Sequence, residues 1–338
     1  MKFELHTNFP EHLHSAWNAL LDESINHVPF LRYEYLHEWW QTRGGGEWSQ
    51  DAQLAIVSAH KGEELVGIAP LFWEPGDNGS GRLLLLGSIE ISDYLDLIVC
   101  PADLAAFSVG LVPFLLSAEL PPWQSLDLYN LLDSSPSLAA LTAAAQANGL
   151  SYRQEMLQHS PYIPLPGDWE TYLAGIDKKQ RHEIRRKIRR AEASEVPVRW
   201  YITSDPAALE DEISAFLGLM AQDPEKAAFL TAPMRQTLSS IMRCSFEAGC
   251  LQLAFLEAGG EKAAAYLSFD YLGRVWVYNS GLDRRFMELS PGWVLLGYLL
   301  QWANENGRTE FDFMRGDEDY KYRFGAVDRR VVRAVLTR

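Results

Sequence analysis

The segment with the densest chemistry lies near the end of the chain, where acidic, basic and phenolic side chains follow a short apolar strand. Asp312 alternates with two phenylalanines on that strand, so its side chain is expected to point away from theirs. Asp317, Tyr320 and Lys321 then follow within five residues. Such groups transfer protons and stabilise developing charge. The alternative is a loop held by ion pairs, which would join Asp317 or Asp319 to Lys321 or Arg323.

A second feature is a basic stretch, Lys178 to Arg190, which holds eight lysines and arginines and one acidic residue. Helical spacing places Arg181, Arg185 and Arg189 along one face, with isoleucines on the opposite side. Guanidinium groups bind phosphates bidentately, so this row suits a phosphorylated ligand. The whole chain carries a net charge of −15, and so large a local excess of positive charge predicts an anion site. The alternative is a solvated helix face.

A third feature is the start of an apolar helix at Ser290, Pro291 and Gly292, which Gly307 is expected to end. Serine suits the N-cap, proline suits the first helical position, and glycine lets a ligand approach the backbone. A helix N-terminus also offers unsatisfied amides and a partial positive charge to an anion. The alternative is an ordinary capped core helix. Other residues expected at this site are Arg284, Arg285, Leu289 and Trp293.

The strand, this helix start and the following segment FDF…GDEDYKYRF together resemble acyltransferases of the GNAT superfamily, and most closely their CelD-like and Fem-type branch. The resemblance covers about Trp169 to Arg333. It implies an enzyme that moves an acyl group, in the simplest case acetyl, from acyl-coenzyme A, with the donor's diphosphate held at the helix start. The usual signature, Arg/Gln-x-x-Gly-x-Gly/Ala, is replaced here by Met287-Glu288-Leu289-Ser290-Pro291-Gly292.

The resemblance also implies roles in the loop after the last strand of that segment. In Fem-type relatives the lysine that matches Lys321 contacts the reacting groups, which implies charge stabilisation or acceptor binding. Asp317 is the expected base or the anchor of an acceptor amine. Asp312 and Tyr320 complete the expected catalytic set.

The acceptor is expected to be an anionic small molecule or envelope precursor that offers an amine or hydroxyl, as in cell-envelope or polysaccharide biosynthesis. Two alternatives stay open: a Fem-type transferase that uses aminoacyl-tRNA, and a non-catalytic protein that binds a polyanion. No long heptad run provides the coiled-coil arm of some Fem-type relatives, which favours acyl-coenzyme A over tRNA. The acidic net charge disfavours DNA. Expected acceptor-binding residues are Arg181, Arg185, Arg189, Asp93 and Tyr94, the last two in an S-D-Y-x-D stretch that is otherwise a plain turn.

Composition limits the class of protein. The 338 residues are 47% hydrophobic, which allows one large or two medium domains. No apolar run approaches the ~20 residues of a membrane span, and the first residues lack a signal-peptide pattern. The three cysteines lack the spacing of a metal site and are expected to be buried free thiols. A cytoplasmic protein without a bound metal is therefore expected.

The order of elements predicts an α/β (α+β) protein of two tandem GNAT-like domains, each a mixed, mostly antiparallel twisted sheet flanked by helices. Residues 1–160 would form a degenerate N-terminal domain and residues 161–338 the acyltransferase domain. Pro161 to Pro166 is interpreted as the linker, because three prolines in six residues favour an extended chain. A loop is expected over Pro75 to Gly81.

Overall fold

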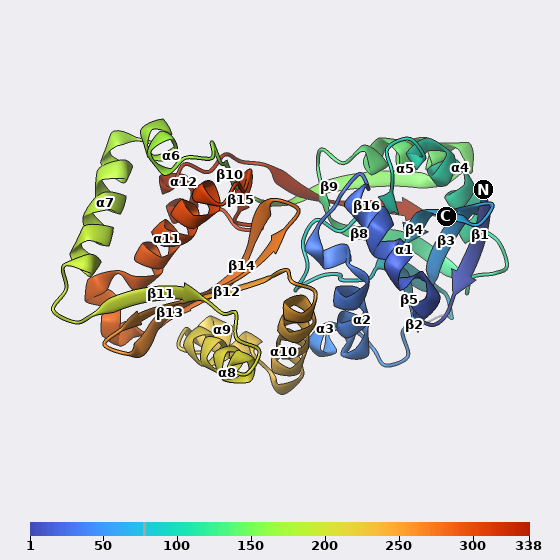
Figure 1. Ribbon diagram of the computed structural model, residues 1–338. Coiled ribbons are helices and arrows are strands. Elements are labelled where there is room, and N and C mark those ends of the chain that lie inside the picture. The colour runs from blue at the N-terminus through green and yellow to red at the C-terminus, as the bar shows by residue number, and fades with distance from the viewer. Residues whose placement is uncertain (77–78) are drawn as a thin grey trace. The chain divides into compact units, whose positions relative to one another are not determined.

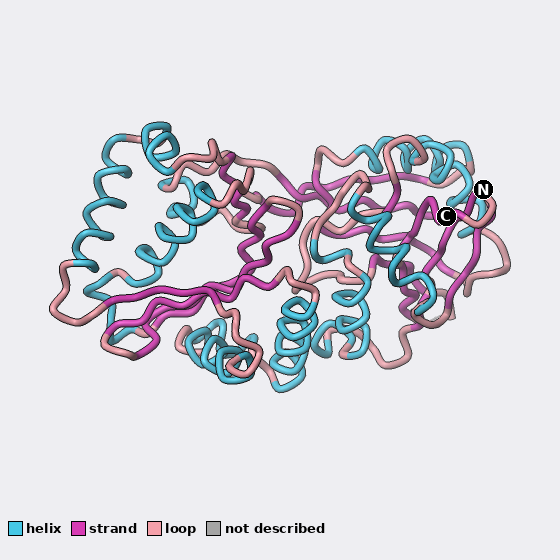
Figure 2. Tube along the Cα trace, viewed as in Figure 1, coloured by secondary structure: helices cyan, strands magenta, loops and turns pink. Residues whose placement is uncertain are grey.

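The computed structural model describes residues 1–76 and 79–338, so residues 77–78 of the loop expected over Pro75 to Gly81 lie outside the described residues. The chain divides into two compact units. The first comprises Met1–Gln158 with Arg330–Arg338, and the second comprises His159–Arg329. Figure 1 labels their elements along the chain, and Figure 2 separates helices, strands and loops by colour.

The first unit contains a four-stranded sheet in the order β1-β3-β4-β7 and a six-stranded sheet in the order β2-β5-β6-β8-β16-β9. The strands are β1 (Lys2–His6), β2 (Gln53–Leu54), β3 (Ile56–Lys61), β4 (Glu64–Ala69), β5 (Leu71–Glu74), β6 (Gly81–Leu85), β7 (Ile98–Val99), β8 (Trp123–Leu132), β9 (Ser151–His159) and β16 (Arg330–Thr337). The helices are α1 (His14–Asp22), α2 (Tyr33–Gln41), α3 (Arg43–Gly46), α4 (Leu104–Leu115) and α5 (Pro136–Ala147), with short 3₁₀ turns at Glu11–Leu13 and Pro29–Leu31.

The last strand, β16, corrects the expected boundary of the second domain, because it pairs antiparallel with β8 in the first unit. Arg333 holds the pairing with a bidentate contact to Asp127, at 2.7 Å from Nε to Oδ1 and 2.6 Å from Nη2 to Oδ2. Val331 and Leu336 are fully buried on this strand. An apolar pattern of this kind indicates a strand, but it does not show which sheet the strand joins.

A buried carboxyl in the first unit makes its stability depend on pH. Asp96 is fully buried, and its oxygens accept hydrogen bonds from the Leu97 amide and the Ser135 hydroxyl. Burial outweighs these bonds and raises the pKa of Asp96 from 3.8 to about 6. The folded state therefore holds this proton more tightly than the unfolded state. The stabilising contribution is complete below pH 3.8 and is lost as pH rises through about 6.

Asp96→Asn should remove this dependence, since the amide resembles the protonated acid and carries no charge. Relative to the wild type, the variant should gain about 2.4 kcal/mol in the free energy of unfolding between pH 4 and pH 7. Urea unfolding of both proteins at the two pH values measures the difference. A constant difference between the proteins would show that Asp96 titrates normally in the folded state.

The second unit is built on one six-stranded sheet in the order β10-β15-β14-β13-β12-β11. Its strands are β10 (Tyr162–Pro164), β11 (Val198–Ile202), β12 (Leu251–Ala258), β13 (Glu261–Tyr271), β14 (Arg274–Leu282) and β15 (Glu310–Asp312). Its helices are α6 (Trp169–Gly175), α7 (Lys178–Glu192), α8 (Leu209–Met220), α9 (Pro224–Phe229), α10 (Ala232–Glu247), α11 (Pro291–Glu305) and α12 (Asp319–Arg323), with the 3₁₀ segment η3 (Arg284–Leu289) before α11.

Each six-stranded sheet has one recorded parallel pair, reached through a helical crossover: β6 with β8 in the first unit and β14 with β15 in the second. The other recorded pairings in both sheets are antiparallel. A parallel pair needs such a crossover, whereas antiparallel strands can be joined by tight turns. The two units therefore follow one plan, as the order of elements predicted.

The proline-rich segment Pro161 to Pro166 is not a linker, which corrects the sequence interpretation. Tyr162–Pro164 forms β10 and pairs antiparallel with β15. This strand lies at the edge of the sheet, where proline is tolerated because one side of the strand needs no hydrogen-bond donors.

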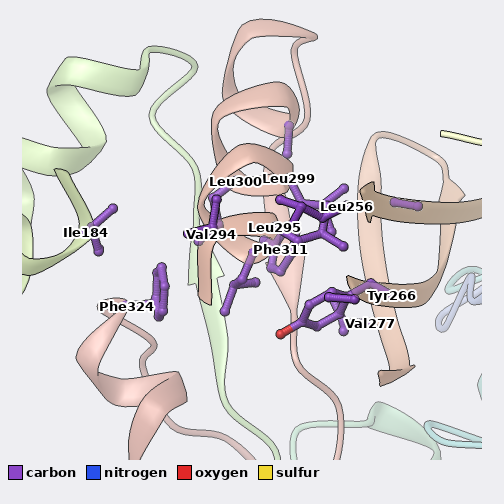
Figure 3. Packing of buried hydrophobic residues seen from close by; sticks show 14 of the residues in the cluster. Ile184, Leu256, Tyr266, Val277, Val294, Leu295, Leu299, Leu300, Phe311 and Phe324 are labelled. Atoms are coloured by element: carbon purple, nitrogen blue, oxygen red, sulfur yellow. The ribbon is translucent and has the colours of Figure 1, made fainter. Parts of the chain in front are cut away.

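The core of the second unit lies between α11 and the sheet. Figure 3 shows Val294, Leu295 and Leu299 of this helix close to Phe311 and Val277 of the strands. Helix α7 packs against the outer side of α11, which has no side chain at Gly297. A Cβ there would lie 3.0 Å from Ile188 Cδ1. Ile184 and Ile188 thus form the anchoring face that the basic stretch predicted.

Helices cover both faces of this sheet. Helix α11 contacts β13 and β14 and is flanked by α6 and α7, whereas α8 contacts β13 and β14 from the side opposite α11 (Figure 1). The connection from α8 to α9 therefore reaches the end of β14, and the start of α11 reaches the same end from the other face. This end of β14 positions the candidate site.

The described residues bear on membrane spans, metal sites and cysteines. None of their helices is long and apolar enough to cross a bilayer. They contain no group of three or more histidines, cysteines or carboxylates that could hold a metal ion. None of the three cysteines forms a disulfide. Cys250 is buried as expected, but Cys100 and Cys244 are partly exposed.

Candidate active site

The candidate site forms where strands β14 and β15 separate. They pair in parallel only from Arg274 and Glu310 to Trp276 and Asp312, and β14 then continues beside β13 to Leu282. A β-bulge adds to the separation, because Ser268 pairs with Val277 and Leu267 with Asn279, which leaves Tyr278 as an extra residue on β14. The gap between the strands opens into a cavity of about 200 Å³. It is lined by Lys226, Tyr266, Val277, Tyr278, Asn279, Ser280, Phe313, Arg315, Glu318, Tyr320 and Lys321.

A second cavity of about 380 Å³ adjoins the first and shares Lys226 and Ser280 with it. It lies between the α8–α9 connection and the end of β14 with η3. It is lined by Leu219, Met220, Gln222, Asp223, Lys226, Ser280, Gly281, Leu282, Arg284 and Met287. We call the smaller space the strand cavity and the larger one the side cavity.

Tyr320 contributes a phenol to the strand cavity. Its ring makes an edge contact with Phe313, at 5.9 Å between centroids. Burial, and then the negative charge of Glu318, raise the pKa of Tyr320 well above its usual value. Tyr266 lines the same cavity from β13, and its pKa is raised chiefly by burial. Both phenols are therefore protonated at neutral pH and can act as proton or hydrogen-bond donors.

Lys321 reaches the strand cavity but is occupied by the loop before it. Its ammonium is 3% exposed and lies 2.9 Å from the carbonyl oxygen of Arg315, 3.0 Å from that of Gly316 and 2.8 Å from Glu318 Oε2. A lysine has three N–H donors, and these three acceptors match them. This geometry favours the ion-paired loop that the sequence left open, with Glu318 as the partner. Arg323 pairs with Asp319, as that alternative allowed.

The two predicted catalytic aspartates lie in different surroundings. Asp317 is exposed and is not among the residues that line the strand cavity. Asp312 is fully buried, pairs with Arg329 and accepts a hydrogen bond from the Met314 amide at 2.6 Å. Its carboxylate therefore belongs to the packing of the sheet around β15 and β10.

The start of α11 has the predicted Ser290-Pro291-Gly292 sequence but a different cap. Ser290 is the N-cap residue, as predicted, but its backbone is left-handed, with φ 53° and ψ 53°, and its side chain makes no capping hydrogen bond. Left-handed backbone is strained for a serine, and such strain concentrates at functional sites. A Cβ on Gly292 would meet only Leu282, at 3.7 Å. The space in front of the first amides is therefore open.

The two arginines before this helix differ. Arg285 is held by Asp283 and Glu261, each at 2.7 Å from Nη2. Arg284 is exposed, lines the side cavity and has no ion-pair partner among the residues that the structure describes. Of the pair expected to bind the donor, Arg284 is thus the one whose charge is available.

Leu289 and Trp293 connect this helix start to the core and to the basic helix. Leu289 packs against the core cluster. The Trp293 ring lies 4.5 Å from that of Phe324, and Lys187 Nζ lies 4.2 Å above the Trp293 ring. Burial lowers the pKa of the Lys187 ammonium that lies over this ring. The basic helix therefore brings a lysine close to the α11 N-terminus.

The predicted arginine row of α7 is directed largely toward its own unit. Arg181 donates to the carbonyl oxygens of Leu173 and Ala174 at the end of α6. Arg185 pairs with Glu170, and Arg189 Nε donates to the carbonyl oxygen of Arg185 at 3.2 Å. An adjacent face is more open. It borders a cavity of about 620 Å³ lined by Lys179, Gln180, His182, Glu183, Arg186 and Arg323.

The remaining predicted residues, Asp93 and Tyr94, lie in the first unit. Asp93 is 3% exposed and Tyr94 is fully buried. The backbone of Tyr94 is left-handed, and its carbonyl oxygen accepts a hydrogen bond from Asn26. The structure thus places both residues in a packed turn.

Sequence reasoning missed Lys226 and Tyr266. Lys226 is a lone lysine in a six-residue helix, and the preceding Asp223-Pro224 pair signals only a helix start. Tyr266 is one aromatic residue in a strand of apolar residues. Neither position carries a pattern in the sequence, because both reach the cavities through the pairing and packing of distant elements.

Comparisons with known proteins can now be set beside this geometry. Residues 178–322 match the family model of an acetyltransferase (GNAT) domain. The structure of FemX is similar, with a TM-score of 0.67 at 12% identity over 99% of this chain and 97% of that one. A conserved protein of unknown function from Bacteroides thetaiotaomicron VPI-5482 has a TM-score of 0.64 at 12% identity, with full coverage of both chains. L-PGS from Bacillus licheniformis has a TM-score of 0.55 at 12% identity, over 95% of this chain and 90% of that one.

No curated protein matches the sequence. The structural similarities show a shared fold and confirm the predicted mixed α/β architecture, in which each unit contains a six-stranded sheet. The family match spans α7, the separating strands, the start of α11 and Tyr320, which together build the candidate site. Over residues 178–322, the chain is therefore similar to the acetyltransferase (GNAT) domain family.

Proposed function

We propose that the second unit transfers an acyl group, in the simplest case acetyl, from acyl-coenzyme A to the amine or hydroxyl of an acceptor. The observation that carries this proposal is the strand cavity, which lies between the separated β14 and β15 beside a protonated Tyr320. The start of α11 follows β14 after the short segment η3. Together they offer a helix N-terminus for the donor's diphosphate and an enclosed space for its thioester.

The donor would be held by backbone amides and one side chain. The amides of Gly292 and Trp293 lie in the first turn of α11, where no carbonyl oxygen of the helix can reach them. Gly292 leaves the approach open, and Arg284 offers an exposed guanidinium nearby. Arg285 would act indirectly, since its pairs with Asp283 and Glu261 hold η3 in place.

Tyr320 would complete the transfer. The acceptor nitrogen or oxygen attacks the thioester carbon and forms the new bond, and its proton leaves to water or, through water, to the exposed Asp317, which does not line the cavity. The carbon–sulfur bond then breaks, and Tyr320 gives its proton to the departing sulfur. Lys321 would act as a positioning residue, because it fixes the loop between β15 and the helix that carries Tyr320.

A titration of thermal stability separates this proposal from its alternatives. Acetyl-coenzyme A should raise the melting temperature in proportion to the logarithm of its concentration, whereas tRNA and heparin should not. Stabilisation by tRNA would instead favour an aminoacyl-tRNA donor. Stabilisation by heparin alone would favour a polyanion-binding protein that uses the open face of α7 around Arg186 and Arg323. Either result would contradict the proposed donor.

A further inference from the structure

We propose that the side cavity is the acceptor subsite and that it takes an apolar α-amino acid, whose carboxylate binds Lys226. This inference rests on the proposed function, since it assumes that the thioester occupies the strand cavity. It adds the chemical class of the acceptor and a residue that selects it. Three features of the cavity support it: the position of Lys226, its lack of a protein counter-ion, and the apolar wall beside it.

Lys226 stands where the two cavities meet. It lines both of them, and its Nζ donates to the carbonyl oxygen of Ser280 at 2.6 Å. This bond holds the ammonium against the part of β14 that lies beyond its pairing with β15. One of the three N–H donors is used, and two remain for a ligand.

The carboxylates near Lys226 are already engaged. Asp223 caps α9, where its Oδ1 accepts the amides of Glu225 and Lys226. Glu318 pairs with Lys321 at 2.8 Å. Within the described part of the chain, Lys226 has no carboxylate at ion-pair distance. Burial lowers the pKa of Lys226 more than these two charges raise it.

A partly desolvated ammonium without a counter-ion is costly unless a ligand supplies the opposite charge. A carboxylate at Lys226 would lie at the junction of the cavities, next to the group that reacts in the strand cavity.

The wall beyond Lys226 is apolar. Leu219, Met220 and Leu282 line the side cavity. Met287 also lines it and is 54% exposed. The volume of about 380 Å³ lies in the range of small-molecule sites. An apolar α-amino acid matches this arrangement of a cation and an apolar wall, because its amine adjoins its carboxylate and its side chain extends away from both.

The test uses L-methionine, L-methioninamide and glycine as probes in isothermal titration calorimetry with the full chain. L-methioninamide lacks the carboxylate and glycine lacks the side chain. The wild type should bind L-methionine about tenfold or more tightly than either of the other two, and saturating coenzyme A should not displace it. In Lys226→Met, L-methionine and L-methioninamide should bind alike, whereas Lys226→Arg should keep a preference for the acid. Lys178→Met, an exposed lysine outside the cavities, is the matched control.

Equal affinities in the wild type, a preference that survives in Lys226→Met, or displacement by coenzyme A would each overturn the proposal. Tight and Lys226-dependent methionine binding without acetyl transfer would support the subsite and contradict the transferase. The binding measurement therefore separates failure of this inference from failure of the proposed function.

Discussion

Tyr320→Phe should lower kcat for acyl transfer about 100-fold or more while leaving KM for acetyl-coenzyme A nearly unchanged. The substitution keeps the aromatic contact with Phe313 and removes only the hydroxyl. Because burial keeps the proton on Tyr320 at neutral pH, the hydroxyl is ready to protonate the departing sulfur. Without it, the leaving thiolate must take its proton from water. Steady-state release of coenzyme A, with the amine that the wild type acetylates fastest, measures both constants.

Tyr322→Phe is the matched control, since Tyr322 lies on the same short helix but is 37% exposed. Its hydroxyl contacts Asp328 at 3.3 Å and is not among the groups that line the strand cavity. This variant should retain the wild-type kcat. If the two variants behaved alike, the proton donor would have to be sought elsewhere, and Tyr266 would be the first alternative.

The parts of the site that depend on local sequence were predictable. The spacing of Ile184 and Ile188 predicted the buried face of α7, and the structure places Ile188 against Gly297 of α11. The Ser290-Pro291-Gly292 run and Gly307 predicted the limits of α11, which spans Pro291–Glu305. Helix periodicity and capping are properties of neighbouring residues, so a single sequence contains them.

The parts that depend on distant contacts were not predictable. The sequence shows a lysine at position 321 among acidic residues, but its three acceptors depend on how the loop from Arg315 folds back. Lys226 reaches Ser280 across 54 residues of chain. Strand β16 joins the sheet of the first unit, where Arg333 makes a bidentate pair with Asp127 of β8. Such long-range pairings leave no periodic signal in the sequence.

Ser290 shows a subtler limit of sequence reasoning. A serine before proline at a helix start predicts a side-chain cap, and the position of the helix was right. The left-handed backbone instead turns the serine away from that role. The cap is missing where the proposed site needs the first amides of the helix for a ligand. A local rule therefore failed at the position where function is proposed, as expected where functional sites violate such rules.

Gly292→Trp should weaken the binding of coenzyme A about 100-fold or more without loss of stability. A Cβ at this position meets only Leu282 at 3.7 Å, so the indole would extend into the space in front of the helix instead of into the core. It would then cover the amides proposed to bind the diphosphate. Hydrogen bonds to a charged group contribute about 1.5–3 kcal/mol each, so the loss of two accounts for the expected weakening. Calorimetric titration with coenzyme A measures the dissociation constant, and thermal unfolding checks the fold.

Two further variants serve as controls for Gly292→Trp. Gly218→Trp adds the same side chain to an exposed glycine of α8 that has no neighbour within 4 Å, and it should bind coenzyme A as the wild type does. Gly292→Ala adds a methyl group where space exists and should weaken binding only slightly. A wild-type dissociation constant in Gly292→Trp would show that the diphosphate does not use the start of α11. The donor site would then have to lie elsewhere, and the proposed placement of the donor between this helix start and Tyr320 would be wrong.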